Sequence, residues 1–152
     1  MRLILSGLLA ATALAAPAFA ETIVIQAGRV ITDAAQPASG PSTITVTDGK
    51  IVSIASGFGD APAGARLVDL KDKTVLPGLI DLHVHLQSNP GGDYREEAVV
   101  SDDYATLMGA RNARTTVKAG FTTVRDLGST PAGGFALRDA TAQGLIPGPR
   151  II

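Results

Sequence analysis

Between Thr22 and Leu76, short runs of alternating apolar and polar residues follow one another along the chain. Alternation with a period of two predicts strands that bury one face. Gly28 marks a bulge or a turn, and Asp48 with Gly49 forms the dipeptide typical of a two-residue hairpin. We therefore expect residues 21–76 to form a small β-sandwich segment. Its predicted strands are 22–25, 29–32, 43–47, 50–54, 66–70 and 74–76.

After Pro77 and Gly78 the pattern changes to strands that alternate with helical stretches. A first strand from residue 79 is followed by a helix that Ser101 opens, with acidic residues in its first turn and Gly120 as its stop. A second strand, 122–126, leads to a helix with Thr130 as N-cap and proline at its first position, ending at Gly144. A third strand begins at Arg150. Such an alternation predicts an α/β fold with a parallel sheet.

The first of these strands carries Asp81, His83 and His85 on one face and apolar residues on the other. We expect both faces to be buried, because parallel strands are covered on both sides. Burying such groups without partners costs roughly 2–7 kcal/mol each. A bound cation removes much of that cost, and imidazole is the commonest metal ligand. The strand therefore predicts a metal site at His83 and His85. Asp81 either orients a histidine or has a capping or turn role.

The segment from Val75 to Leu86 resembles the amidohydrolase superfamily, since Pro77-Gly78, two apolar residues and Asp81 precede a His-x-His pair. The segments KAGFTTVRDLG (118–128) and IPGPRI (146–151) resemble the imidazolonepropionase-related and Xaa-Pro or Xaa-Arg dipeptidase branch. The resemblance covers roughly residues 22–152. It implies the start of a (β/α)8 TIM-type barrel, residues 77–152, that ends after about two and a half βα units.

A barrel of this type needs about 250 residues, whereas the chain has 152. We therefore expect an N-terminal fragment of a longer enzyme, or a non-catalytic truncated remnant or scaffold segment. The resemblance implies a bridging carboxylated lysine, two further histidines and an aspartate on later strands, beyond Ile152. We assign no catalytic residue within the chain and expect the fragment alone to be inactive and its barrel part not to fold alone.

The resemblance implies hydrolysis of a dipeptide or a cyclic amide at its C–N bond by metal-activated water, with two Zn²⁺ ions in the complete enzyme. Arg125 and Asp126 end the second barrel strand, where barrel chemistry lies. They are either substrate-side or orienting groups, or a structural ion pair. The long loop 87–100 either lines the site or is a flexible surface loop.

Residues 1–20 have the pattern of a secretory signal: Arg2, an apolar stretch, and Ala18-Phe19-Ala20 as the cleavage site. The alternative is an uncleaved anchor, but the apolar run is shorter than the about 20 residues that a spanning helix needs. We expect export to the periplasm or secretion, and no membrane contact after cleavage.

The composition excludes several partners and chemistries. The net charge of −1 comes with no basic patch, which argues against nucleic acid as a partner. The chain has no cysteine, which excludes disulfides, thiolate ligands and a cysteine nucleophile. The expected partner is a small-molecule or dipeptide substrate, and a homo-oligomer is compatible with this.

Overall fold

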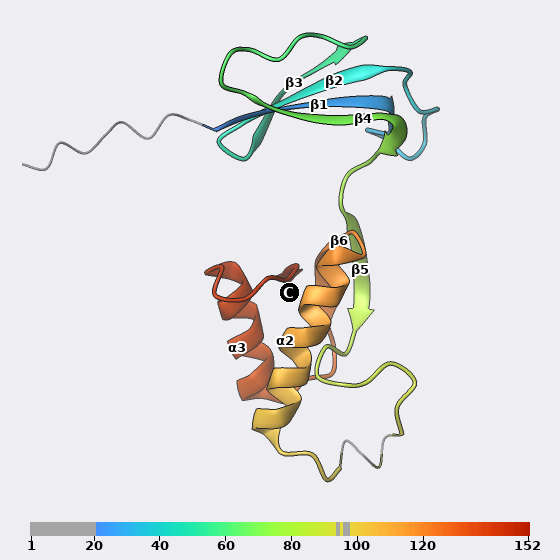
Figure 1. The fold of residues 1–152 in the computed structure, drawn as a ribbon. Coiled ribbons are helices and arrows are strands. Elements are labelled where there is room, and N and C mark those ends of the chain that lie inside the picture. The colour runs from blue at the N-terminus through green and yellow to red at the C-terminus, as the bar shows by residue number, and fades with distance from the viewer. Residues whose placement is uncertain (1–20, 94, 96–97) are drawn as a thin grey trace, which may run out of the picture. The chain divides into compact units, whose positions relative to one another are not determined.

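The computed structural model describes residues 21–93, 95 and 98–152. The predicted signal segment and Tyr94 of the long loop lie outside these residues. The chain divides into two compact units, one that ends at Leu76 and one that runs from Pro77 to Ile152 (Figure 1). Among the described residues, no helix has the length and apolar character needed to cross a membrane.

The first unit contains one four-stranded sheet with the order β3-β2-β1-β4. Strand β1 pairs antiparallel with β2 and parallel with β4, and β2 pairs antiparallel with β3. The second sheet of the predicted sandwich is not among the described residues of this unit. The strands are β1 (Thr22–Val30), β2 (Ser42–Thr47), β3 (Lys50–Ser56) and β4 (Arg66–Val75).

Strand β1 is continuous across Gly28, where two short strands were expected. Its pairing with β4 shifts register between Ala27 and Arg29, so Gly28 marks a bulge and not a turn. A Cβ atom at Gly28 would overlap the carbonyl of Lys71 on β4. Only glycine lets the two backbones approach this closely. Strand β4 is likewise continuous over the two predicted runs 66–70 and 74–76.

The predicted hairpin between β2 and β3 is confirmed. Asp48 and Gly49 have φ angles of 49° and 72°. Two successive positive φ values define the type I′ turn, whose twist matches that of the paired strands. Ala27 and Val30 of β1 and Ile44 of β2 form a buried apolar cluster in this unit.

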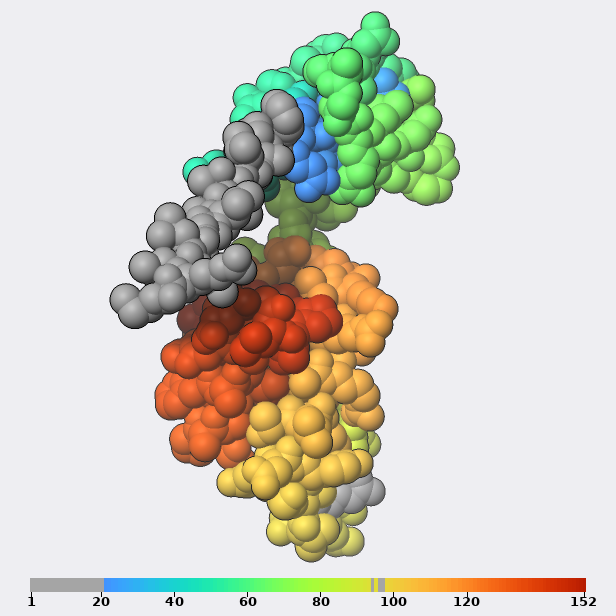
Figure 2. Space-filling model, turned by 60° about the vertical axis from the view of Figure 1, so that its left-hand side comes forward, coloured from blue at the N-terminus to red at the C-terminus, as the bar shows by residue number. Residues whose placement is uncertain are grey.

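The second unit begins with two parallel βα units and the start of a third strand, as predicted. The parallel sheet has the order β5-β6-β7. Helices α2 and α3 pack against each other, and their side chains form one continuous surface (Figures 1 and 2). The elements are β5 (Leu79–Val84), α2 (Asp102–Lys118), β6 (Phe121–Asp126), α3 (Pro131–Ala142) and β7 (Arg150–Ile151). This is the beginning of a TIM-type barrel.

The helix ends follow the sequence pattern. Ser101 caps α2 by accepting a hydrogen bond from the N–H of Tyr104 at 3.4 Å. Gly120 follows α2 with a φ of 99°, in the left-handed region that favours glycine. Thr130 precedes Pro131 at the start of α3, but its side chain makes no capping bond. Its hydroxyl has another partner, Gln87.

The prediction that both faces of the first barrel strand are buried is wrong for this chain. Ile80 and Leu82 are 62% and 64% exposed, and both histidines are exposed. Strand β5 lies at the edge of the sheet, and the two helices pack chiefly against β6, β7 and each other. Only the end of the apolar face is covered, where Leu86 joins the core cluster with Val84 packed against it. The free energy cost of burying the two imidazoles therefore does not support a metal site here. Any support must come from the geometry of the two rings.

Candidate metal centre

His83 and His85 direct their imidazoles toward a common point. The two Nε2 atoms are 3.1 Å apart, and the ring centroids are 5.2 Å apart with the planes tilted by 31°. His83 lies in β5 and His85 directly follows its last residue. Residues two apart on an extended backbone project from the same face, which places both rings side by side.

The separation of the two Nε2 atoms fits one bound ion. Zinc binds imidazole nitrogen at about 2.0–2.1 Å, so two nitrogens at tetrahedral positions are about 3.3–3.4 Å apart. The observed 3.1 Å is close to this value. The same distance also suits one N–H···N hydrogen bond between the two rings. Two imidazoles alone are an incomplete site, and the described residues contain no group of three or more potential ligands.

Asp81 holds the backbone of His83. Its Oδ1 accepts a hydrogen bond from the N–H of His83 at 3.0 Å. The carboxylate thus acts on the main chain next to the first imidazole. This is the local, turn-like role that the sequence left open for Asp81. An additional effect on a metal-bound imidazole stays a prediction.

Arg125 and Asp126 do not pair with each other. The ion pairs among the described residues do not include these two, so the predicted structural ion pair is wrong. Successive residues of a strand project to opposite faces, which keeps the two side chains apart. Arg125 instead donates through Nε to the carbonyl oxygen of Leu82 at 2.9 Å. It thereby ties β6 to the backbone of β5 beside His83.

Asp126 organises the chain around His85. Its Oδ2 accepts from the N–H of Leu86 at 3.3 Å and from the hydroxyl of Ser129 at 2.6 Å. Its Oδ1 accepts from the N–H of Gly128 at 3.1 Å. A Cβ atom at Gly128 would overlap Nδ1 of His85, so that edge of the ring packs directly on the glycine backbone.

Gln87 is a buried polar residue that sequence reasoning missed. Its side chain is 5% exposed. Its Nε2 donates to the hydroxyl of Thr106 on α2 at 3.0 Å. Its Oε1 accepts from the N–H of Thr130 at 2.6 Å and from the hydroxyl of Thr130 at 3.2 Å. One side chain thus connects the loop after β5 to both helices. The available signal was that residue 87 continues the polar alternation of 81, 83 and 85.

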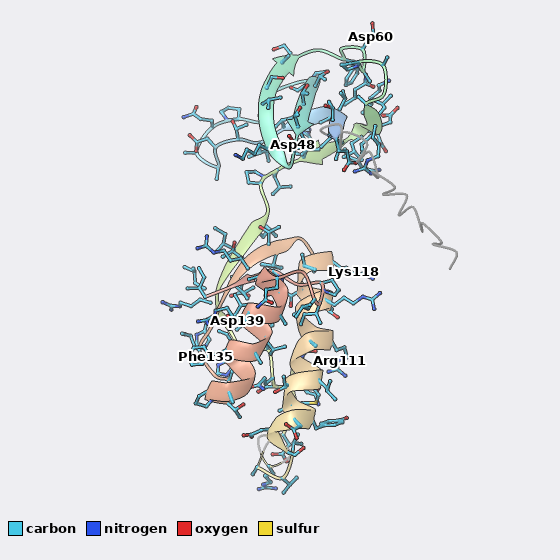
Figure 3. All side chains as sticks on the ribbon, turned by 90° about the vertical axis from the view of Figure 1, so that its left-hand side faces the viewer. Asp48, Asp60, Arg111, Lys118, Phe135 and Asp139 are labelled. Atoms are coloured by element: carbon cyan, nitrogen blue, oxygen red, sulfur yellow. The ribbon has the colours of Figure 1, made fainter. Side chains whose placement is uncertain are left out.

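Helix α2 holds the start of the long loop. Asn112 donates through Nδ2 to the carbonyl oxygens of Leu86 and Ser88 at 2.8 and 2.9 Å. Arg111, labelled on α2 in Figure 3, donates to Oδ1 of Asn89 at 2.8 Å. These contacts anchor residues 86–89, so this part of the loop is not a free surface segment. Asn112 also escaped the sequence analysis, although it neighbours the small residue Ala113 on the buried face of the helix.

Two cavities adjoin this region of the second unit. A cleft of about 430 Å³ is lined by both histidines, Asp81 and residues of α2 that include Asn112. A second cavity of about 540 Å³ is lined by Gln87, residues of the long loop and the first turns of α2. Both volumes are in the range of small-molecule sites, about 300–1,000 Å³. The long loop lines both, as the first of its two predicted roles requires.

Comparison with known proteins gives the chain its family. The model of the Amidohydrolase family matches residues 74–152, which include β5 and both histidines. The chain belongs to the amidohydrolase family. The predicted superfamily and the predicted start of a TIM-type barrel are therefore confirmed.

This amidohydrolase chain is similar in sequence to curated dihydroorotases and to an allantoinase. Among curated proteins, a dihydroorotase of Syntrophus aciditrophicus (strain SB) is 40% identical over 87 residues, which are 57% of this chain and 20% of the relative. An allantoinase of Streptomyces avermitilis is 40% identical over 74 residues, 49% of this chain and 16% of the relative. The chain thus spans about a fifth of the length of the curated relatives it matches.

The solved structures most useful here are dipeptidases. A Xaa-Pro dipeptidase with methionine bound in its active site has a TM-score of 0.79 and 32% identity, over 87% of this chain and 32% of that one. A prolidase in complex with N-methylphosphonate-L-proline has a TM-score of 0.72 and 29% identity, over 86% and 31% of the two chains. The chain spans about a third of the length of these structures.

Proposed function

We propose that this chain is part of a metal-dependent hydrolase that cleaves the C–N bond of a dipeptide or a cyclic amide. The observation that supports this best is the convergence of the Nε2 atoms of His83 and His85, 3.1 Å apart, on the first strand of an amidohydrolase barrel. Two imidazoles at this separation suit one Zn²⁺ ion, and the resemblance to the superfamily implies two such ions in the complete enzyme.

Each residue of the site has a defined task in this proposal. His83 and His85 would hold one ion through their Nε2 atoms. Such an ion, when bound, would supply the Lewis acidity that activates water and polarises a substrate carbonyl. Asp81 fixes the main chain of His83, and Arg125 holds the carbonyl of Leu82 next to it. These backbone contacts keep the first imidazole in place while substrate enters and leaves.

We favour a dipeptide as the substrate over a cyclic amide. The dipeptidase structures match 86–87% of this chain. Function depends on the site more than on the fold, so this preference rests on similarity alone.

We further propose that residues 1–20 direct export and are removed after Ala20, which N-terminal sequencing of the native protein tests.

The decisive experiment is a hydrolysis assay on the purified full-length protein, with a panel of dipeptides and cyclic amides. We expect activity on at least one of them, its loss after removal of metal by a chelator, and its return when Zn²⁺ is added. His83→Ala and His85→Ala should each reduce the rate to background, whereas Gln143→Ala, at an exposed position after α3, should not.

Two outcomes would contradict the proposal. Activity that survives chelation and both histidine substitutions would show that the reaction does not use this pair. A native protein that hydrolyses no member of the panel, and whose intact mass is that of residues 21–152, would favour the alternative of a non-catalytic remnant.

A further inference from the structure

His85 lies beyond the end of strand β5, whereas His83 lies within it. Strand β5 ends at Val84, whose carbonyl oxygen accepts from the N–H of Leu127, the residue after β6, at 3.0 Å. The backbone of His85 itself makes a turn, in which its carbonyl oxygen accepts from the N–H of Ser88 at 3.1 Å. The orientation of this second imidazole therefore depends on contacts other than the sheet.

Those contacts lead to one carboxylate. Asp126 accepts from the N–H of Leu86, the residue after His85, and from the N–H of Gly128, on whose backbone the His85 ring packs. One carboxylate thus fixes both the backbone that follows His85 and the glycine backbone on which the His85 ring packs. The 2.6 Å bond from the Ser129 hydroxyl fixes the carboxylate in turn. Hydrogen bonds to an ionised acceptor are about twice as strong as neutral ones.

We propose that Asp126 is a positioning residue for His85. Through Leu86 and Gly128 it sets the direction of the His85 ring and so places Nε2 at 3.1 Å from Nε2 of His83. Asp126 acts through the backbone and does not touch the reacting atoms. The inference rests on the proposed function in so far as His85 is a metal ligand. The geometric claim itself concerns the imidazole without metal.

Gly128→Ala and Asp126→Asn perturb this arrangement in two ways. The added methyl group of Gly128→Ala would overlap the imidazole of His85, so that the ring must change its position. Asp126→Asn keeps the shape of the side chain but replaces one acceptor oxygen with a donor, so the bonds from the N–H of Leu86 and the N–H of Gly128, which use different oxygens, cannot both persist. Ser129→Ala removes the supporting hydroxyl, and Ser129→Thr restores it.

Two measurements on tag-free full-length protein test the proposal. Long-range proton–nitrogen NMR of the metal-free protein observes the imidazoles directly, and residues 1–152 contain two histidines. Competition with a chromophoric chelator gives the Zn²⁺ affinity. Loss of a supporting contact around a ligand usually costs 10–100-fold in metal affinity. Asp139→Asn is the matched control, because Asp139 lies exposed on α3 and pairs with Arg138 (Figure 3).

We expect Asp126→Asn and Gly128→Ala to shift the His85 ring signals more than those of His83 and to weaken Zn²⁺ binding about tenfold or more. Ser129→Ala should have a smaller effect that Ser129→Thr reverses, and Asp139→Asn should have none. Unchanged His85 signals in Gly128→Ala and Asp126→Asn would overturn the proposal. Equal changes at both histidines together with loss of helical circular dichroism would also overturn it, since Asp126 would then only support the fold.

The same data separate this proposal from the proposed function. If the His85 signals respond selectively but the wild-type protein binds no Zn²⁺, Asp126 still positions the ring and the metal-dependent function fails. If Zn²⁺ binds through the histidines but the His85 signals do not respond, the function stands and the role of Asp126 fails.

Discussion

Gln87→Met is the most informative change to the second unit. The substitution keeps a long unbranched side chain, so it removes hydrogen bonds while leaving little empty space. The buried amide of Gln87 makes three bonds, one to Thr106 and two to Thr130. Each is worth about 0.5–1.5 kcal/mol net, and a buried donor left without a partner costs about 1–3 kcal/mol. We therefore expect the free energy of unfolding to fall by about 2–4 kcal/mol.

Urea unfolding of the full-length protein, followed by circular dichroism at 222 nm, measures this loss. Gln143→Met is the control, because Gln143 is exposed, and should change stability by at most about 0.5 kcal/mol. Combining Gln87→Met with Thr130→Val should cost less than the sum of the single changes, since both remove the bond from the Thr130 hydroxyl to Oε1 of Gln87. A Gln87→Met protein as stable as the control would refute the assignment of Gln87 as the link between the loop and the two helices.

Three further changes test other parts of the structure. Gly28→Ala should destabilise the first sheet by about 1–3 kcal/mol in urea unfolding, because its Cβ atom meets a backbone carbonyl, whereas Gly40→Ala, with open space around it, should not. Asn112→Ala should cost about 1–3 kcal/mol and speed hydrogen exchange in the loop after β5, where two carbonyl groups lose their donor. A hydrogen bond from Lys73 lowers the pKa of Asp72 below its ordinary 3.8. Any contribution of this exposed pair to folding is therefore present above the ordinary carboxylate pKa and is lost as the pH falls through the lowered pKa. Because exposed ion pairs contribute little, Asp72→Asn should leave urea unfolding at pH 7 unchanged.

Patterns that depend on near neighbours in the sequence were predicted well. The hairpin at Asp48 and Gly49 and the helix that Ser101 opens follow from backbone preferences and caps, which are local. The order of strands and helices after Pro77 follows from the change of hydrophobic period. The continuity of β1 could not be predicted, because a glycine suits a turn and a bulge equally well. Only the register of β1 against β4 shows that Gly28 forms a bulge.

Contacts between residues far apart in the sequence, and burial that depends on other elements, were missed or predicted wrongly. Gln87 is 43 residues from Thr130, and no local pattern indicates that pair. Arg125 and Asp126 suggested an ion pair by adjacency, but strand geometry separates them. The exposure of Ile80 depends on which elements cover the edge strand. The His-x-His motif fixed the position of the candidate metal ligands, whereas the support from Asp126 became visible only in three dimensions.

The metal content of the tag-free full-length protein tests the central claim most directly. The wild-type protein and the His83→Ala, His85→Ala double variant should be purified side by side and analysed by elemental mass spectrometry, with folding checked by circular dichroism. We predict bound metal in the wild-type protein, with less metal per molecule in the double variant while the fold is kept. Equal metal content in the two folded proteins, or none in either, would contradict a metal site at His83 and His85.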